Sequence, residues 1–175
     1  PGMGSRLRSQ AGRPLTVPSI LVTNDDGVNA PGLEALAAAL EPLGDITVVA
    51  PADEASAASN ALTIRRPLCL TRVSASWYSV DGTPTDCINV GITDGLGKVP
   101  DLVVSGINNG LNVGEDVTYS GTVGGALEGV LLGALGVAVS LQRGGEPMNY
   151  KSAAVVAEWF WKICEVAVIG SPLES

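Results

Sequence analysis

The chain has 175 residues, of which 46% are hydrophobic and 16% charged, so it can bury one sizeable core as a single domain. Its 22 glycines and 4% aromatic residues suit a tightly turned α/β protein better than a disordered one. A formal net charge of −8 argues against a general binder of nucleic acid or of membrane surfaces, and no apolar run reaches the ~18–20 residues of a membrane span.

Histidine and cysteine usage narrow the chemistry further. The sequence contains no histidine, which excludes histidine-dependent catalysis and histidine-ligated zinc or copper within it. Its cysteines, Cys69, Cys87 and Cys164, are odd in number and widely spaced. Because no secretory signal is evident, we interpret them as reduced, buried packing residues of a cytosolic protein.

The first predicted strand, Ile20–Asn24, follows an aperiodic Gly/Arg/Ser/Pro-rich stretch, Pro1–Pro18, that we expect to be a flexible extension. The strand ends at two adjacent carboxylates, Asp25 and Asp26. Ligands of open α/β sheets bind at this end of the strands, and adjacent carboxylates resist desolvation unless a cation or donors neutralise them. The pair is therefore a candidate divalent-metal site, although a solvated turn or a helix cap also explains it.

A parallel βαβ unit is predicted next. Leu33–Leu40 is expected to be a helix with Pro31 near its first turn, and Ile46–Ala50 a second strand. The loop that follows, Pro51–Asn60, lies at the same predicted sheet edge as the acidic pair. It carries four side chains with oxygen donors, Asp53, Glu54, Ser56 and Ser59. Plain surface is the alternative interpretation of this loop.

The middle of the chain is expected to be structural. Leu62–Val80 alternates polar and apolar residues, which favours a hairpin-like excursion. Thr83 is predicted to cap a helix that has Pro84 at its first position and Asp86 in its first turn, and that runs to about Gly95.

A third core strand, Asp101–Ser105, leads into a Gly/Asn-rich loop, Gly106–Gly114, that is too polar for the core. Its asparagines, Asn108, Asn109 and Asn112, offer amide oxygens at the same edge as the acidic pair. Alternatively, they populate left-handed conformations in tight turns.

The last predicted elements are a helix over Val123–Leu135, a strand over Val137–Leu141 and an amphipathic helix over Ser152–Ile163. The backbone N–H groups at the start of the first of these, around Ser120–Thr122, make a ready phosphate site, although an ordinary helix cap explains the same residues.

Three loops are predicted to share one sheet edge: the turn with the acidic pair after the first strand, Pro51–Asn60 after the second strand, and the Gly/Asn-rich loop after the third strand. Together with the helix start at Ser120–Thr122 they predict a phosphate ester bound beside a metal. Carboxylate, hydroxyl and amide oxygens suit a hard cation, Mg²⁺ or Mn²⁺. The cation would polarise a phosphoryl oxygen and lower the pKa of a bound water, and one aspartate would orient that water or accept its proton.

Other phosphate-handling folds fit less well. The sequence lacks the G-x-G-x-x-G turn of dinucleotide folds and the P-loop motif. Haloacid-dehalogenase-type phosphatases need two aspartates separated by one residue, whereas Asp25 and Asp26 are adjacent. A phosphoacceptor receiver domain needs an aspartate and a lysine where this chain has Ser105 and Gln142–Arg143.

Several blocks occur in order between Ile20 and Leu141. They are Val22–Gly27, Val49–Pro51, Gly82–Cys87, Val104–Asn108, Ser120–Val123 and Gly125–Gly129. Together they resemble the SurE (survival protein E) family of nucleotidases and acid-phosphatase-like enzymes. The resemblance implies a Rossmann-like α/β fold, a parallel-sheet three-layer sandwich. It also implies a cytoplasmic homodimer or homotetramer that removes phosphate from nucleoside 5′- or 3′-monophosphates and has some activity on polyphosphate.

The resemblance also assigns residues. The implied ligands of a divalent cation, Mg²⁺ or Mn²⁺ with Ca²⁺ as a substitute in crystals, are Asp25, Asp26, Ser56 and Asn108. The two aspartates would be the catalytic residues. The implied substrate-binding residues are Asn24 and Asn112, which would line the site, and Ser120, Gly121 and Thr122, which would face the phosphate.

The chain departs from the family pattern in places. Ala55 stands where relatives carry a basic or amide residue, and Asn60 where some have histidine. Relatives continue for roughly another third of a chain beyond Leu141, so we expect residues 19–175 to form one domain whose C-terminal part is incomplete.

The competing function is a nucleotide- or phosphate-binding protein that keeps the metal site without turnover.

Overall fold

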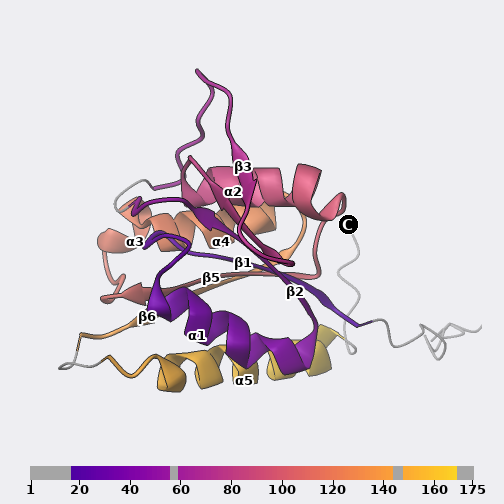
Figure 1. Ribbon diagram of the computed structural model, residues 1–175. Helices are drawn as coiled ribbons and strands as arrows, with labels where there is room; N and C mark the ends of the chain where they lie inside the picture. Colours follow the sequence, from indigo (N-terminus) through magenta and orange to yellow (C-terminus); the bar gives the residue numbers. More distant parts are fainter. Residues whose placement is uncertain (1–16, 56–58, 144–147, 169–175) are drawn as a thin grey trace, which may run out of the picture.

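The computed structural model contains one six-stranded sheet with strand order β3-β4-β2-β1-β5-β6 (Figure 1). It describes residues 17–55, 59–143 and 148–168. The strands are β1 (Ser19–Thr23), β2 (Asp45–Pro51), β3 (Leu70–Arg72), β4 (Trp77–Val80), β5 (Leu102–Asn109) and β6 (Leu135–Leu141). All strand pairs are parallel except β3 with β4, which confirms the predicted parallel sheet with a hairpin-like excursion.

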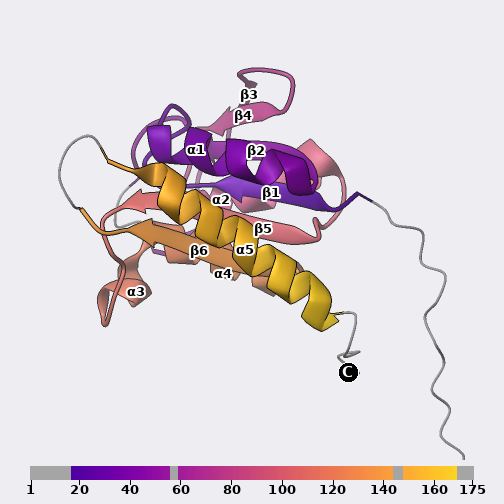
Figure 2. The same ribbon diagram turned by 90° about the horizontal axis from the view of Figure 1, so that it is seen from below.

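Helices cover both faces of this sheet. They are α1 (Pro31–Leu40), α2 (Pro84–Val90), α3 (Asp116–Tyr119), α4 (Gly121–Leu131) and α5 (Tyr150–Val168), with short turns η1 (Glu41–Leu43) and η2 (Gly91–Leu96). Helices α1 and α5 lie side by side on one face, and α2 and α4 on the other (Figures 1 and 2). The predicted three-layer α/β sandwich is therefore confirmed. Among the described residues, no helix is both long and apolar enough to cross a membrane.

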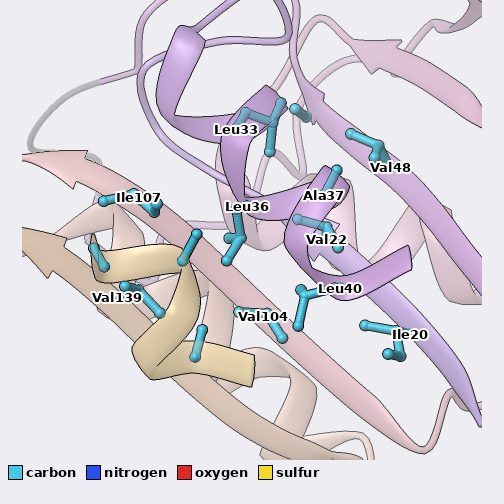
Figure 3. Close-up of a cluster of buried hydrophobic side chains, with 14 of the residues drawn as sticks. Ile20, Val22, Leu33, Leu36, Ala37, Leu40, Val48, Val104, Ile107 and Val139 are labelled. Atoms are coloured by element: carbon cyan, nitrogen blue, oxygen red, sulfur yellow. The ribbon is translucent and has the colours of Figure 1, made fainter. Parts of the chain in front are cut away.

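The core on the α1 side explains why the central strands are continuously apolar. Leu33, Leu36 and Leu40 recur at helical spacing on α1 and are completely buried (Figure 3). They belong to one cluster with Ile20 and Val22 of β1, and the intervening Leu21 packs in the cluster on the opposite face. Strands buried on both faces carry apolar residues at every position.

On the other face, α4 lies very close to β5. A Cβ atom added to Gly129 would lie 2.6 Å from Cβ of Val103, so a glycine is required for this approach. The close packing fixes where α4 begins, at the carboxyl end of the sheet. Cys87 is buried in this cluster, and burial raises the pKa of its thiol. Cys69 is exposed, so its prediction as a buried residue was wrong, and the side chain of Cys164 lies outside the described residues.

The boundaries of two helices differ from the prediction. Helix α2 ends at Val90 and continues as the π-helix η2, whereas an α-helix to about Gly95 was predicted. Helix α4 ends at Leu131, because Gly133 adopts a left-handed φ of +98° that stops the helix, and β6 then starts at Leu135. The short helix α3 was not predicted.

Strand β5 is longer than predicted. After a register shift beyond Ser105 it pairs again with β6, at Asn108 with Ser140 and Asn109 with Leu141. Ile107 is completely buried in the α1-side cluster, so the segment predicted as a polar loop is partly core. The shift places Asn108 and Asn109 at the end of a strand instead of in a loop.

Candidate metal and phosphate site

Asp25 follows β1 and is held by the start of α4. Its Oδ1 accepts a 2.6 Å hydrogen bond from Thr122 Oγ1, and the residue is 5% exposed. A Cβ atom on Gly121 would lie 3.0 Å from Asp25 Cβ and 3.2 Å from Oδ2, so glycine lets the helix start approach the carboxylate. The first strand and the helix start, predicted as two parts of one site, therefore meet.

The loop after β2 meets the same point. The backbone N–H of Ala55 donates to the carbonyl oxygen of Asp25 at 2.7 Å. Ser56, the next residue and an implied metal ligand, lies outside the described residues.

Asn24 shapes the turn that carries the acidic pair. Its Nδ2 donates to the carbonyl oxygen of Gly27 at 2.9 Å, and Gly27 has a left-handed φ of +99°. Its Oδ1 is buried and has no hydrogen-bond partner among the described residues. Because a buried acceptor without a partner is costly, this oxygen marks a place where a ligand would be favourable.

Asp26 is half-buried, and its environment disfavours the charged form. Burial raises the pKa of its carboxyl group, and the neighbouring charges of Asp25 and Glu54 raise it further. The backbone N–H of Asn109 and the charge of Arg143 act in the opposite direction. A bound cation would likewise favour the ionised form.

The end of β5 supplies amide groups. Nδ2 of Asn108 donates to the carbonyl oxygen of Gly110 at 2.8 Å, which leaves Oδ1 of the same amide for a ligand. Oδ1 of Asn109 is buried and has no partner among the described residues. Sequence reasoning singled out Asn108 but gave no specific role to Asn109 or Arg143, because the hydrogen bond between these two residues depends on the register of β5 and β6.

The remaining predicted residues are placed as follows. Asn112 donates from Nδ2 to Ser140 Oγ at 2.8 Å, so it ties its loop to β6. Ser120 caps α4 by accepting from the N–H of Val123 at 3.1 Å. The N–H groups of Gly121 and Thr122, at the first positions of the helix, have no acceptor in the preceding turn and point out of its N-terminus.

This set of donors suits a hard divalent cation. It combines two carboxylates, Asp25 and Asp26, with amide oxygens of Asn24, Asn108 and Asn109, two of which are buried without a partner. No cluster of three or more Asp, Glu, Cys or His residues occurs in the described part of the chain, so neutral oxygens must complete any coordination shell. Such mixed oxygen ligands are those preferred by Mg²⁺ and Mn²⁺.

Residues 20–172 match the family described as survival protein SurE. The chain belongs to the SurE family. This confirms the resemblance drawn from the sequence blocks.

Individual SurE relatives agree with this assignment. The chain is 55% identical over 139 residues to the 5′-nucleotidase SurE of Geobacter sulfurreducens, an alignment that covers 79% of this chain and 53% of that protein. It is 55% identical over 138 residues to the 5′-nucleotidase SurE of Methylococcus capsulatus, which covers 79% and 55% of the two chains. The chain thus spans about half the length of the curated relatives it matches.

The SurE fold is confirmed by a solved structure. The SurE protein from Aquifex aeolicus superposes with a TM-score of 0.80 at 42% sequence identity, covering 89% of this chain and 62% of that one.

Proposed function

We propose that this protein is a divalent-metal-dependent phosphomonoesterase that hydrolyses nucleoside 5′- or 3′-monophosphates to nucleoside and phosphate. The observation that carries the proposal is the 2.6 Å bond between Thr122 and Asp25, which brings an acidic pair to a helix N-terminus with free N–H groups. The names of the relatives, 5′-nucleotidase SurE, support nucleoside monophosphates as the substrate class. Polyphosphate is proposed as a further substrate, from the family resemblance of the sequence.

The proposed cation, Mg²⁺ or Mn²⁺, would be held by Asp25, Asp26 and Asn108, with Ser56 as a further ligand. Bound there, it would supply Lewis acidity toward a phosphoryl oxygen and lower the pKa of water. Thr122 keeps the Asp25 carboxylate in one orientation. The N–H groups of Gly121 and Thr122 bind phosphate oxygens, and the helix dipole of α4 favours their negative charge.

Asp26 is proposed as the proton acceptor. Burial and the neighbouring charge of Asp25 raise the pKa of its carboxyl group, which favours proton uptake, whereas a bound cation would act in the opposite direction. The carboxylate takes a proton from the attacking water, whose oxygen bonds to phosphorus as the bond from phosphorus to the nucleoside oxygen breaks. The nucleoside oxygen takes up a proton and leaves as an alcohol, and no covalent intermediate forms on the protein.

A phosphate-release assay on a panel of nucleoside monophosphates, with and without Mn²⁺ or Mg²⁺, tests this function. Asp26→Ala is expected to lower phosphate release by about 10²–10⁴-fold. The control is Asp45→Ala, which removes an exposed carboxylate at the start of β2, at the opposite sheet edge. Metal-independent hydrolysis, or an Asp26→Ala variant with full activity, would contradict the mechanism. Nucleotide binding without phosphate release would favour the alternative, a phosphate-binding protein without turnover.

The proposed assembly is a cytoplasmic homodimer or homotetramer. An interface is supported by the exposed apolar residues on α5, where Val155, Val156 and Trp159 are 58%, 62% and 66% exposed. Light scattering after size-exclusion chromatography measures the assembly, and a monomer at micromolar concentration would contradict it.

A further inference from the structure

Arg143 lies just beyond β6 and reaches across the end of β5 toward the acidic pair. Its Nε donates to the carbonyl oxygen of Asn109 at 3.0 Å. The backbone of Asn109 and the charge of Arg143 both act to lower the pKa of the Asp26 carboxyl group. The end of β5 therefore lies close to both the arginine and the candidate proton acceptor.

The position of Gly110 shows what else borders the guanidinium. A Cβ atom placed on Gly110 would lie 3.8 Å from Nε of Arg143 and 3.9 Å from Nδ2 of Asn108. The arginine and the candidate metal ligand Asn108 thus border the same position. The space there is left open by a glycine with a left-handed φ of +140°.

The charge of Arg143 stands out in this part of the molecule. The chain has a formal net charge of −8, and Asp25, Asp26 and Glu54 gather near the site. The other described basic residues belong to other elements. They are Arg65, Arg66 and Arg72 in the hairpin segment, Lys98 before β5, and Lys151 and Lys162 on α5. A cationic side chain beside this acidic edge favours the approach of a phosphate dianion.

Most of the guanidinium remains available for that role. In the described part of the chain, Arg143 forms one hydrogen bond, through its Nε, whereas Arg66 is paired with Asp81. The four N–H bonds of Nη1 and Nη2 are left, and this planar pair of donors matches two oxygens of a phosphate group.

We propose that Arg143 binds the substrate's phosphate through its Nη groups and so sets the preference of the site for a dianionic phosphomonoester. The inference rests on the proposed function for the identity of the substrate. Asn109 acts as the positioning residue, because its carbonyl oxygen accepts the hydrogen bond that orients the guanidinium.

The competing explanation is that Arg143 only braces the end of β5. The two roles differ in their effect on the metal. Removing a phosphate-binding cation weakens phosphate affinity but leaves Mn²⁺ affinity equal or tighter, because a repelling positive charge is lost near Asp26. If Arg143 only stabilises the end of β5, its removal disorders Asn108 and Asp26 together. The binding of both Mn²⁺ and phosphate is then weakened.

The test compares the wild type with Arg143→Gln, Arg143→Lys and the control Lys98→Gln, which removes an exposed charge in the turn before β5. We measure Mn²⁺ affinity by calorimetry, inorganic phosphate affinity on the Mn²⁺-loaded protein, and KM and kcat for a nucleoside monophosphate. For Arg143→Gln we expect phosphate affinity to fall, and KM to rise, by about 10–100-fold, with undiminished Mn²⁺ affinity. Arg143→Lys should lose less, and Lys98→Gln should match the wild type.

Unchanged phosphate affinity in Arg143→Gln would overturn the inference, and so would a joint loss of Mn²⁺ and phosphate affinity. If the wild type binds phosphate but releases none from any nucleotide, the proposed function fails. The comparison of direct phosphate affinities then still decides the role of Arg143.

Discussion

The starts of helices α2 and α4 contain the same chemical parts, a hydroxyl N-cap and a nearby aspartate, and use them differently. At α2 the aspartate is Asp86, which lies in the first turn of the helix itself. At α4 no acidic residue occurs in the first turn, and the aspartate is Asp25 from the end of β1. The negative charge at the start of α2 comes from the helix itself, and the negative charge at the start of α4 comes from the residue after β1.

The α2 start is saturated with hydrogen bonds. Asp86 accepts from the N–H of Thr83 at 2.9 Å, from the N–H of Thr63 at 2.8 Å and from Thr63 Oγ1 at 2.7 Å. Thr83 Oγ1 in turn accepts from the N–H of Asp86, which completes a capping box. This end therefore stabilises the fold, and both carboxylate oxygens of Asp86 are already used within the protein.

The α4 start is left open. Ser120 satisfies only the N–H of Val123, and Asp25 uses one oxygen for Thr122. Two N–H groups and the second carboxylate oxygen remain. The comparison teaches that a cap made from local residues serves stability, whereas a helix start paired with an acid from elsewhere in the chain is organised for binding.

The largest difference between the two helix starts is expected when Asp25 and Asp86 are each replaced by Asn. Asp25→Asn should lower phosphate release by about 10²–10⁴-fold with little change in melting temperature, because a metal-binding charge is lost. Asp86→Asn should lower the free energy of unfolding by about 2–3 kcal/mol, because charged hydrogen bonds at a buried cap are lost. Calorimetry and activity per folded molecule separate the two effects. Equal effects on stability would remove the distinction between the helix starts.

A smaller difference between the two helix starts is expected when Thr122 and Thr83 are each replaced by Val. Thr122→Val removes the donor to Asp25 and should lower metal affinity or activity by about 10–100-fold. Thr83→Val removes an N-cap and should cost about 1–2 kcal/mol of stability with activity retained. Urea unfolding and Mn²⁺ titration measure the two outcomes. A Thr122→Val variant with normal Mn²⁺ affinity would show that Asp25 needs no orienting partner.

A matched pair of glycines tests the crowding at Asp25. Gly121→Ala places a methyl group 3.0 Å from Asp25 Cβ, so we expect roughly three- to tenfold lower activity from a displaced carboxylate. Gly95→Ala has no atom within 4 Å of the new methyl and should leave kinetics unchanged. Steady-state kinetics on both variants decide this, and equal kinetics would mean that Asp25 adjusts without cost.

The smallest effect on the fold is expected from chelation. The two buried clusters that hold the sheet and helices together contain none of the candidate metal ligands. Removing divalent ions should therefore abolish phosphate release and leave the far-ultraviolet circular dichroism unchanged. Loss of helical signal with chelator would mean that the metal also supports the fold.

The predictable parts of the fold are those determined by residues that lie close together in the sequence. The helix over Leu33–Leu40 and the cap at Thr83 each depend on residues a few positions apart, and both predictions are confirmed. Cys69 was wrongly assigned to the core, because the hairpin segment has one face open to solvent and residue type alone does not say which face a position takes.

The site was less predictable, because its contacts join distant segments. The acidic pair and the helix start were found as separate signals, and strand order brought them to one edge. The contact of Arg143 with Asn109 depends on the register shift after Ser105, for which the sequence carries no signal. Asn112 and Ser120 were predicted to face substrate, and the structure gives each a hydrogen bond within the protein.

The bond between Asp25 and Thr122 spans 97 residues of sequence, which has a consequence for the newly made chain. At the usual speed of translation, roughly 5–20 s separate the synthesis of these two residues. During that interval the acidic pair has neither the helix start nor the asparagines of β5 beside it, so the nascent chain has no assembled site. The capacity to bind a phosphate ester therefore arises late in synthesis, after the first strands and helices have left the ribosome.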